Sequence, residues 1–137
     1  MAYEESLKSI TLDADASIAV YTGVSGQPGS ASPNNGKQFR FVKITGAHQA
    51  GLATGAANEV LCGVLQNKPQ RVGEAATVGI FGVSMVESGA ALAAGVQVKV
   101  DGTGRPIAAA AGAAYVGTTL ASSGAAGELI PVLLHTN

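Results

Sequence analysis

Short segments of alternating or continuous apolar residues, separated by glycine-rich turns, run along most of the chain. Residues 96–100 (Val-Gln-Val-Lys-Val) alternate cleanly and lead into Asp-Gly-Thr-Gly at 101–104, a composition typical of a hairpin turn. Pro106 follows at a position that suits an edge strand or a strand start. Further strands are expected at 10–12, 17–21, 37–44, 59–65, 77–87, 115–121 and 128–135. This pattern favours an all-β fold, either a small β-barrel or a β-sandwich.

Residues 37–44 alternate in a way that predicts two distinct strand faces. Phe39 and Phe41 fall on one face, and Arg40, Val42 and Ile44 fall on the other. Two basic residues flank an aromatic one here, so Arg40, Phe41 and Lys43 are candidate contacts for a partner. A strand with one solvated face is the simpler interpretation.

One short helix is expected near the middle of the chain. Ser88 is a suitable N-cap for residues 90–94, and Gly95 is a suitable terminator. This helix would have about two turns, which is too short to be stable without tertiary contacts.

The first 36 residues differ from the rest. Two prolines, four glycines and three serines between Gly23 and Gly36 predict a long loop, and loops of that length are usually functional. We therefore divide the chain into an extended N-terminal arm with short strands and a loop (1–36) and a β-barrel-like domain (37–137). Further candidate partner contacts in the arm and loop are Tyr3, Leu7, Pro28 and Pro33.

A weak internal repeat is also visible. Gly63, Gly73-Glu74 and Val78 recur 54 positions later as Gly117, Gly127-Glu128 and Val132. Two similar hairpins in one barrel or sandwich would explain this recurrence. Chance would also explain it in a chain so rich in glycine and valine.

Composition points to a protein that needs partners. Hydrophobic residues make up 47% of the chain, but aromatics are only 4% and there are 19 glycines. Small side chains bury little apolar area each, so contact with copies of the chain or with a larger partner would add stability. The net charge of −1 and the absence of a basic stripe argue against nucleic acid. With no signal peptide or long apolar stretch in the sequence, we expect a soluble protein made in a cytoplasm, with no membrane partner.

No arrangement of residues predicts catalysis. His48, His135 and Cys62 have no evident nucleophile or base beside them, and three such ligands are too few and too dispersed for zinc. Cys62 lies among apolar residues and is expected to be a reduced core thiol. We therefore expect no enzymatic activity, no catalytic residues, no metal, no cofactor and no small-molecule substrate.

Five segments follow one another in a characteristic order from Asn58 onward. They are Val-Leu-Cys-Gly-Val-Leu-Gln-Asn-Lys-Pro (60–69), Gly-Glu-Ala-Ala-Thr-Val-Gly-Ile-Phe-Gly (73–82), Ala-Ala-Gly-Val-Gln-Val-Lys-Val-Asp-Gly-Thr-Gly (93–104), Val-Gly-Thr-Thr-Leu-Ala (116–121) and Gly-Glu-Leu-Ile-Pro-Val-Leu-Leu (127–134). This order resembles the head-decoration, or capsid cement, proteins of tailed bacteriophages. The resemblance spans roughly residues 37–134 and rests on the order of the segments.

The resemblance implies a barrel-like subunit, often a homotrimer, on the outside of a shell built by a separate phage major capsid protein. Such subunits add after the shell expands, so the protein would be made in the bacterial host cytoplasm and end in the virion. The family has no catalytic residues to carry over. Two alternatives are a carbohydrate-binding or host-attachment module and an enzyme or its accessory domain. The absence of Trp and the presence of only Tyr3, Tyr21 and Tyr115 argue against sugar stacking.

Overall fold

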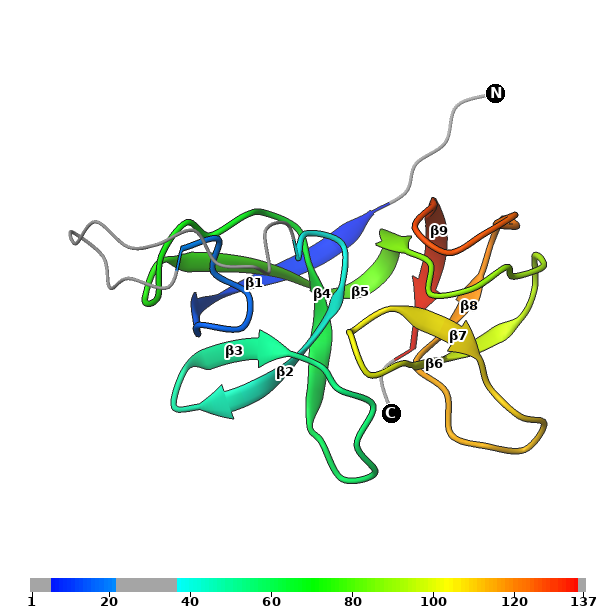
Figure 1. Cartoon of the computed structure of the whole chain (residues 1–137), viewed down its shortest axis with the longest axis horizontal. Helices are drawn as coiled ribbons and strands as arrows, with labels where there is room; N and C mark the ends of the chain where they lie inside the picture. The colour runs from blue at the N-terminus through cyan, green and yellow to red at the C-terminus, as the bar shows by residue number, and fades with distance from the viewer. Residues whose placement is uncertain (1–5, 22–36, 136–137) are drawn as a thin grey trace.

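The computed structural model describes residues 6–21 and 37–135, and this part of the chain is all β (Figure 1). Its strands form one nine-stranded sheet. The bounds are β1 (Leu7–Ala14), β2 (Phe41–Gly46), β3 (Gln49–Leu52), β4 (Leu61–Leu65), β5 (Ala75–Glu87), β6 (Gln97–Val100), β7 (Pro106–Ala108), β8 (Gly117–Thr119) and β9 (Leu129–Leu134).

Five strands close into a barrel, which we call the first barrel. Their order is β1-β3-β2-β4-β5, and pairing of β1 with β5 closes the ring. The β1–β5 ladder is antiparallel, whereas Asp13 and Gln49 begin a short parallel ladder between β1 and β3. The prediction of an all-β fold is therefore confirmed, and of the two architectures expected, barrel or sandwich, the structure shows a barrel. Strand β1, which the sequence placed in an N-terminal arm, is part of this barrel.

A second unit continues from the same long strand. The C-terminal half of β5 pairs with β9, and the order then runs β9-β8-β6-β7. Figure 1 shows the two units side by side, with β5 passing from one into the other. Pro106 begins β7 at the end of this order, as the sequence predicted.

The two units repeat the same strand pairing. In the first barrel Val64 pairs with Gly79 and Leu65 with Val78, and 54 positions later Thr118 pairs with Leu133 and Thr119 with Val132. The carboxylates after the two repeated glycines also act alike: Glu74 accepts from the backbone N of Gln70 at 2.9 Å, and Glu128 accepts from that of Gly124 at 2.8 Å. Shared register at this level favours a true repeat over chance.

The other hairpins extend the repeat. Val42 pairs with Leu52 and Lys43 with Gly51 in β2–β3, while Val98 pairs with Ala108 and Lys99 with Ile107 in β6–β7. A residue with positive φ precedes each hairpin: Phe39, at 65°, lies before β2–β3, and Gly95, at 79°, lies before β6–β7. Their backbone N–H groups donate to the equivalent carbonyls of Leu65 and Thr119 at 2.7 and 2.8 Å. Both units thus share one plan.

The two apolar cores correspond residue by residue. Each of six core side chains in the first barrel has a buried counterpart in the second unit: Leu12/Val86, Ile18/Leu92, Val42/Val98, Leu65/Thr119, Ala76/Ile130 and Val78/Val132. Alternation along β1, β5 and β9 explains this, because every second residue of a strand points inward. Each unit therefore buries its own small core.

Three local predictions differ from the structure. No helix forms at 88–95, because its polar groups bond elsewhere: the Ser88 hydroxyl donates to Ala125 O at 2.9 Å, and Leu92 and Ser123 exchange backbone bonds. Residues 17–20 form a turn rather than a strand, since the Asp15 carboxylate accepts from the Ser17 N–H at 2.8 Å. Strand β3 was missed because its glycine and His48 resembled a loop.

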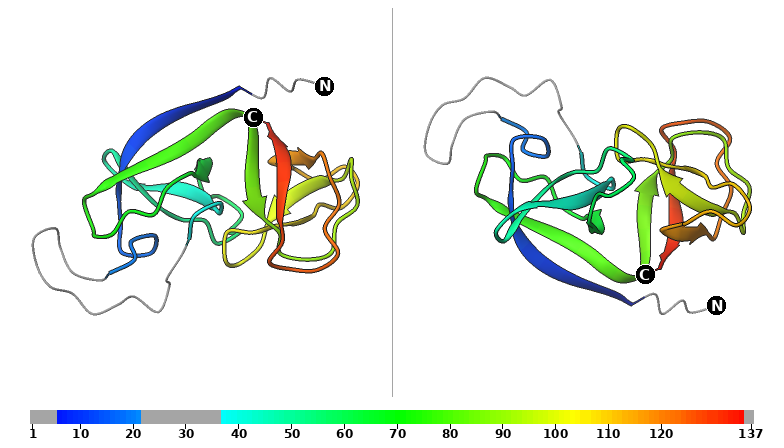
Figure 2. Two further views of the ribbon diagram at one scale, coloured as in Figure 1. Left: turned by 90° about the horizontal axis from the view of Figure 1, so that it is seen from above. Right: turned by 90° about the horizontal axis from the view of Figure 1, so that it is seen from below.

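Gly82 lies where β5 passes between the two units. It pairs with Leu7 of β1 on one side and with Leu134 of β9 on the other, and its φ is +104°. Figure 2 shows β5 turning sharply between its two halves. A Cβ at this position would collide with the carbonyl oxygen of Ser6. Only glycine fits both the dihedral and the close approach of β1.

Gly82→Ala should therefore destabilise the protein more than Gly127→Ala does. Both positions have positive φ, but a Cβ on Gly127 meets no atom within 4 Å, so Gly127→Ala should cost only the dihedral strain of about 1–3 kcal/mol. Urea unfolding monitored by circular dichroism gives both values. Equal losses would contradict the role assigned to Gly82.

Candidate contact surface

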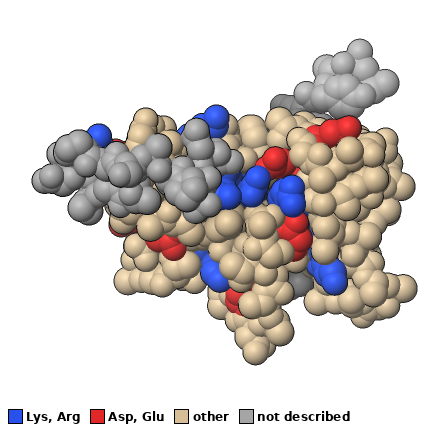
Figure 3. Space-filling model, in the orientation of Figure 1, with Lys and Arg blue, Asp and Glu red and all other residues tan. Residues whose placement is uncertain are grey.

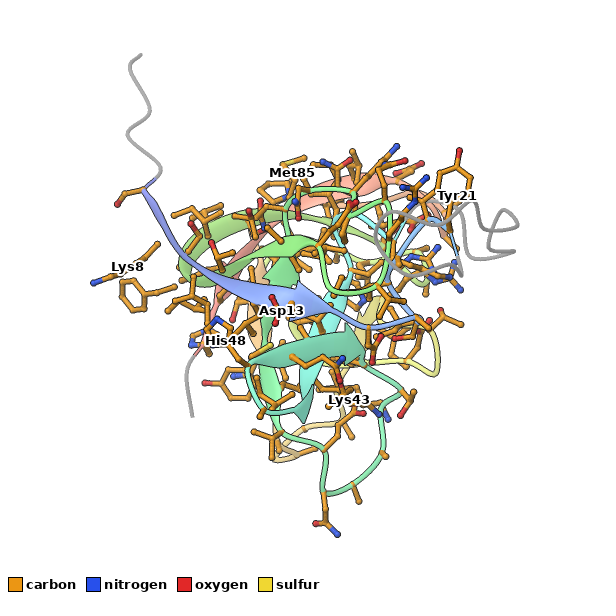
Figure 4. The ribbon with its side chains drawn as sticks, turned by 90° about the vertical axis from the view of Figure 1, so that its left-hand side faces the viewer. Lys8, Asp13, Tyr21, Lys43, His48 and Met85 are labelled. Carbon is orange, nitrogen blue, oxygen red and sulfur yellow. The ribbon has the colours of Figure 1, made fainter. Side chains whose placement is uncertain are left out.

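An apolar sheet face lies exposed on the outside of the second unit. We call it the β5–β9–β8 face, and it consists of Val83, Met85, Leu120, Leu129, Pro131 and Leu133. Ladder pairs Val83–Leu133 and Met85–Pro131 place their side chains together, and the Leu120 N–H donates to Pro131 O at 2.9 Å. Leu129 is 50% exposed, Leu120 47%, and Met85 and Leu133 39% each. Met85 lies at the outer edge of the molecule in Figure 4.

The first barrel provides an internal comparison for this face. Its counterparts of Val83, Met85, Leu120, Leu129 and Pro131 are, in the same order, Ser9, Thr11, Gln66, Ala75 and Thr77. The sixth residue, Leu133, corresponds to Gly79. Four of the six counterparts are polar and none is large and apolar, although the backbone arrangement is the same. Strand geometry alone therefore does not require large apolar residues here. Exposed apolar patches of this kind commonly mark contact sites.

Charged side chains gather instead near the junction of the two units, on the face shown in Figure 3. Arg40 Nε lies 2.7 Å from Glu87 Oε2, and Arg40 Nη1 donates to Thr103 O at 3.2 Å. Asp101 pairs with Arg105 at 3.3 Å. Burial alone would raise the pKa of the Asp101 carboxyl, but hydrogen bonds from Arg105 and Thr103 lower it below its usual value. The Arg40–Glu87 pair ties the end of β5 to the turn before β2, and the Asp101–Arg105 pair braces the β6–β7 turn.

The contact residues expected from the sequence do not form one surface in the described part of the chain. Tyr3, Pro28 and Pro33 lie outside the described residues. Leu7 is partly buried against the core of the second unit.

The three expected contacts around β2 are also engaged or buried. Arg40 is paired with Glu87, and Lys43 lies 3.1 Å from the Glu59 carboxylate. Phe41 is buried between the two units and is only 2% exposed, so a partner cannot reach its side chain. Phe39 is not on a strand face with it, because Phe39 lies in the preceding turn.

Phe41→Ala should cost about 3–5 kcal/mol of unfolding free energy, because it leaves a cavity between the units. Lys43→Ala, two positions along the same strand, should cost less than about 1 kcal/mol, since partly exposed ion pairs contribute little. Urea unfolding of both variants measures this. A small loss of unfolding free energy for Phe41→Ala would contradict its burial and restore Phe41 as a candidate partner contact.

A cavity of about 360 Å³ opens between the units, lined by apolar residues together with Glu59, Cys62 and His135. Its polar groups already have protein partners. The backbone N–H groups of Thr54 and Gly55 donate to the Glu59 carboxylate at 3.0 and 2.6 Å. Burial would raise the pKa of Glu59, but these bonds and Lys43 lower it. His135 Nε2 lies 3.0 Å from Thr118 Oγ1.

The other titratable residues singled out in the sequence are dispersed. His48 lies at the β2–β3 turn, where its carbonyl accepts from the Asp13 N–H at 2.8 Å (Figure 4). Among residues 6–21 and 37–135, no group of three or more His, Cys, Asp or Glu is placed to hold a metal ion. No helix in that part of the chain could span a membrane.

Cys62 is a partly buried free thiol on β4, and its Sγ lies 3.5 Å from Val42 O. Burial raises its pKa to about 11. Because the thiolate is the reactive form, alkylation of the native protein at pH 8 should be slow, and it should become rapid in denaturing urea. Iodoacetamide labelling followed by mass measurement tests this. Rapid complete labelling of the folded protein would contradict the expected shielding.

No protein-family model and no curated protein matches this chain. The structure itself defines the class: an all-β protein built from a closed five-stranded barrel and a second unit of the same plan, joined through a shared strand.

Proposed function

We propose that this protein is a non-catalytic structural subunit that decorates the outside of a tailed-bacteriophage capsid. Its partners would be the phage major capsid protein and copies of itself in a homotrimer. It would be made in the bacterial host cytoplasm and end on the outer surface of the virion. The observation that carries the proposal is the β5–β9–β8 face, an uncharged sheet surface suited to protein–protein contact.

The segments that resemble decoration proteins fall on the repeated elements. Residues 60–69 contain β4, residues 73–82 contain the first half of β5, and residues 93–104 contain β6 and its hairpin turn. The last two segments contain β8 and β9. The five segments therefore include strands of both units rather than one local motif. This supports the proposal, because the resemblance then rests on strands from both units of the structure.

The physical logic of decoration suits such a subunit. A ligand that binds only the assembled state stabilises that state by RT ln(1 + [L]/Kd), which is about 2.7 kcal/mol per site at a hundredfold excess over Kd. A shell offers many equivalent sites, so the stabilisation from a modest contact at each site adds up over the whole shell. A subunit of this kind needs a stable fold and a contact surface, and it needs no reaction centre.

Purified protein should bind expanded shells that lack decoration, reach saturation, and raise the temperature at which the shells break. Binding is measured by co-sedimentation and disruption by light scattering. Unexpanded shells serve as the control and should bind little protein, because decoration sites appear on expansion. Failure to bind expanded shells of the cognate phage would overturn the proposal.

A further inference from the structure

We propose that the β5–β9–β8 face is the surface through which copies of this chain pack against each other around the axis of the homotrimer. Decoration alone does not say which face joins the subunits. The inference therefore goes beyond the proposed function, and it holds or fails in solution, without any shell.

The charge distribution favours a copy of the same chain as the occupant. None of the six side chains of the β5–β9–β8 face is ionisable. Glu87, which follows Met85 on the same side of β5, is already paired with Arg40 at 2.7 Å. Copies of this face can therefore meet around that axis without bringing like charges together. A partner recognised by opposite charge would need charged groups on the face itself.

The chain contains a precedent for this kind of contact. On the first barrel, Phe41 and Val64 point outward from their own core, yet they are 2% and 0% exposed, because they pack into the core of the second unit. Outward residues of the first barrel that stay exposed or partly exposed include the polar Thr11 and Thr77, and also Phe81, which is 60% exposed near the end of the barrel part of β5. Two large outward apolar residues of the first barrel, Phe41 and Val64, are thus covered by another unit of the same plan. The apolar residues of the β5–β9–β8 face still lack such a cover.

The size of the face matches the centre of an interface. Six ladder pairs join β5 to β9, so the face is about 20 Å long at ~3.4 Å per residue and about 14 Å wide for three strands at ~4.8 Å. Its area of about 280 Å² compares with the roughly 800 Å² that each partner buries in a stable interface. Interfaces have an apolar centre and a polar rim. Partly exposed Thr118 of β8, which pairs with Leu133, and exposed Gln97 of the next strand, β6, border the apolar residues.

The composition also favours a permanent contact over a late, reversible one. Homo-oligomer interfaces are about 65% apolar, whereas non-obligate interfaces are about as apolar as ordinary protein surface. A face made only of Val, Met, Leu and Pro is best covered as soon as the chain folds, and copies of the chain are then the available partner. A shell contact would form later, after the subunits have assembled.

Met85→Lys tests the inference, with Thr11→Lys as its matched control at the equivalent position of the first barrel. Sedimentation velocity over a range of concentrations, without shells, should show the wild type and Thr11→Lys as oligomers. Met85→Lys should weaken association by roughly 30-fold or more, because a buried charge at the interface centre has no partner. Leu129→Lys with Ala75→Lys forms a second matched pair. Equal urea midpoints within each pair exclude unfolding as the cause.

Two results would overturn the inference. One is a monomeric wild type at every concentration, and the other is equal association of Met85→Lys and Thr11→Lys. Shell binding is then measured separately with all four variants. If the wild type is monomeric but Met85→Lys alone no longer binds shells, the face is the shell contact, and decoration survives while self-association fails. If the wild type self-associates through this face but binds no shell, decoration fails alone.

Discussion

The architecture depends on one strand serving two units. Residues of β5 before Gly82 close the first barrel against β1 and β4, and residues after it pair with β9. The change of partner requires a sharp turn in a continuous strand, and glycine at φ +104° allows it. Because the shared strand fixes both ladders, the two units cannot move apart without breaking backbone hydrogen bonds in one of them.

Duplication explains how a chain with few large side chains builds a stable molecule. Each unit has a small core of Val, Ala, Leu and Ile, and neither core is large. Phe41 and Val64 add a third buried layer between the units, so that the second core extends across the junction. The Arg40–Glu87 pair lies at the same junction. Apolar burial between the units thus supplies the stability that aromatic residues would otherwise provide in one larger core.

The same duplication separates what the fold requires from what it does not. Inward positions are apolar or small in both units, because both must fill a core. Outward positions differ: Thr11 and Thr77 correspond to Met85 and Pro131. A difference at positions with equal backbone geometry reflects different surroundings. The polar set suits water, and the apolar set suits a partner, which is the basis of both proposals.

Alternation, glycine turns and the Asp101–Gly104 hairpin were enough to predict an all-β barrel or sandwich and most of its strands, because these signals are local. The repeat was detectable at four positions, but only the ladder register could distinguish it from chance. Burial of Phe41, closure by β1 and the loss of the Ser88 helix depend on residues distant in sequence. The contact face was missed for the same reason: in Leu129–Leu134 both sides of the strand are apolar, and only the tertiary structure decides which side meets a core and which remains open.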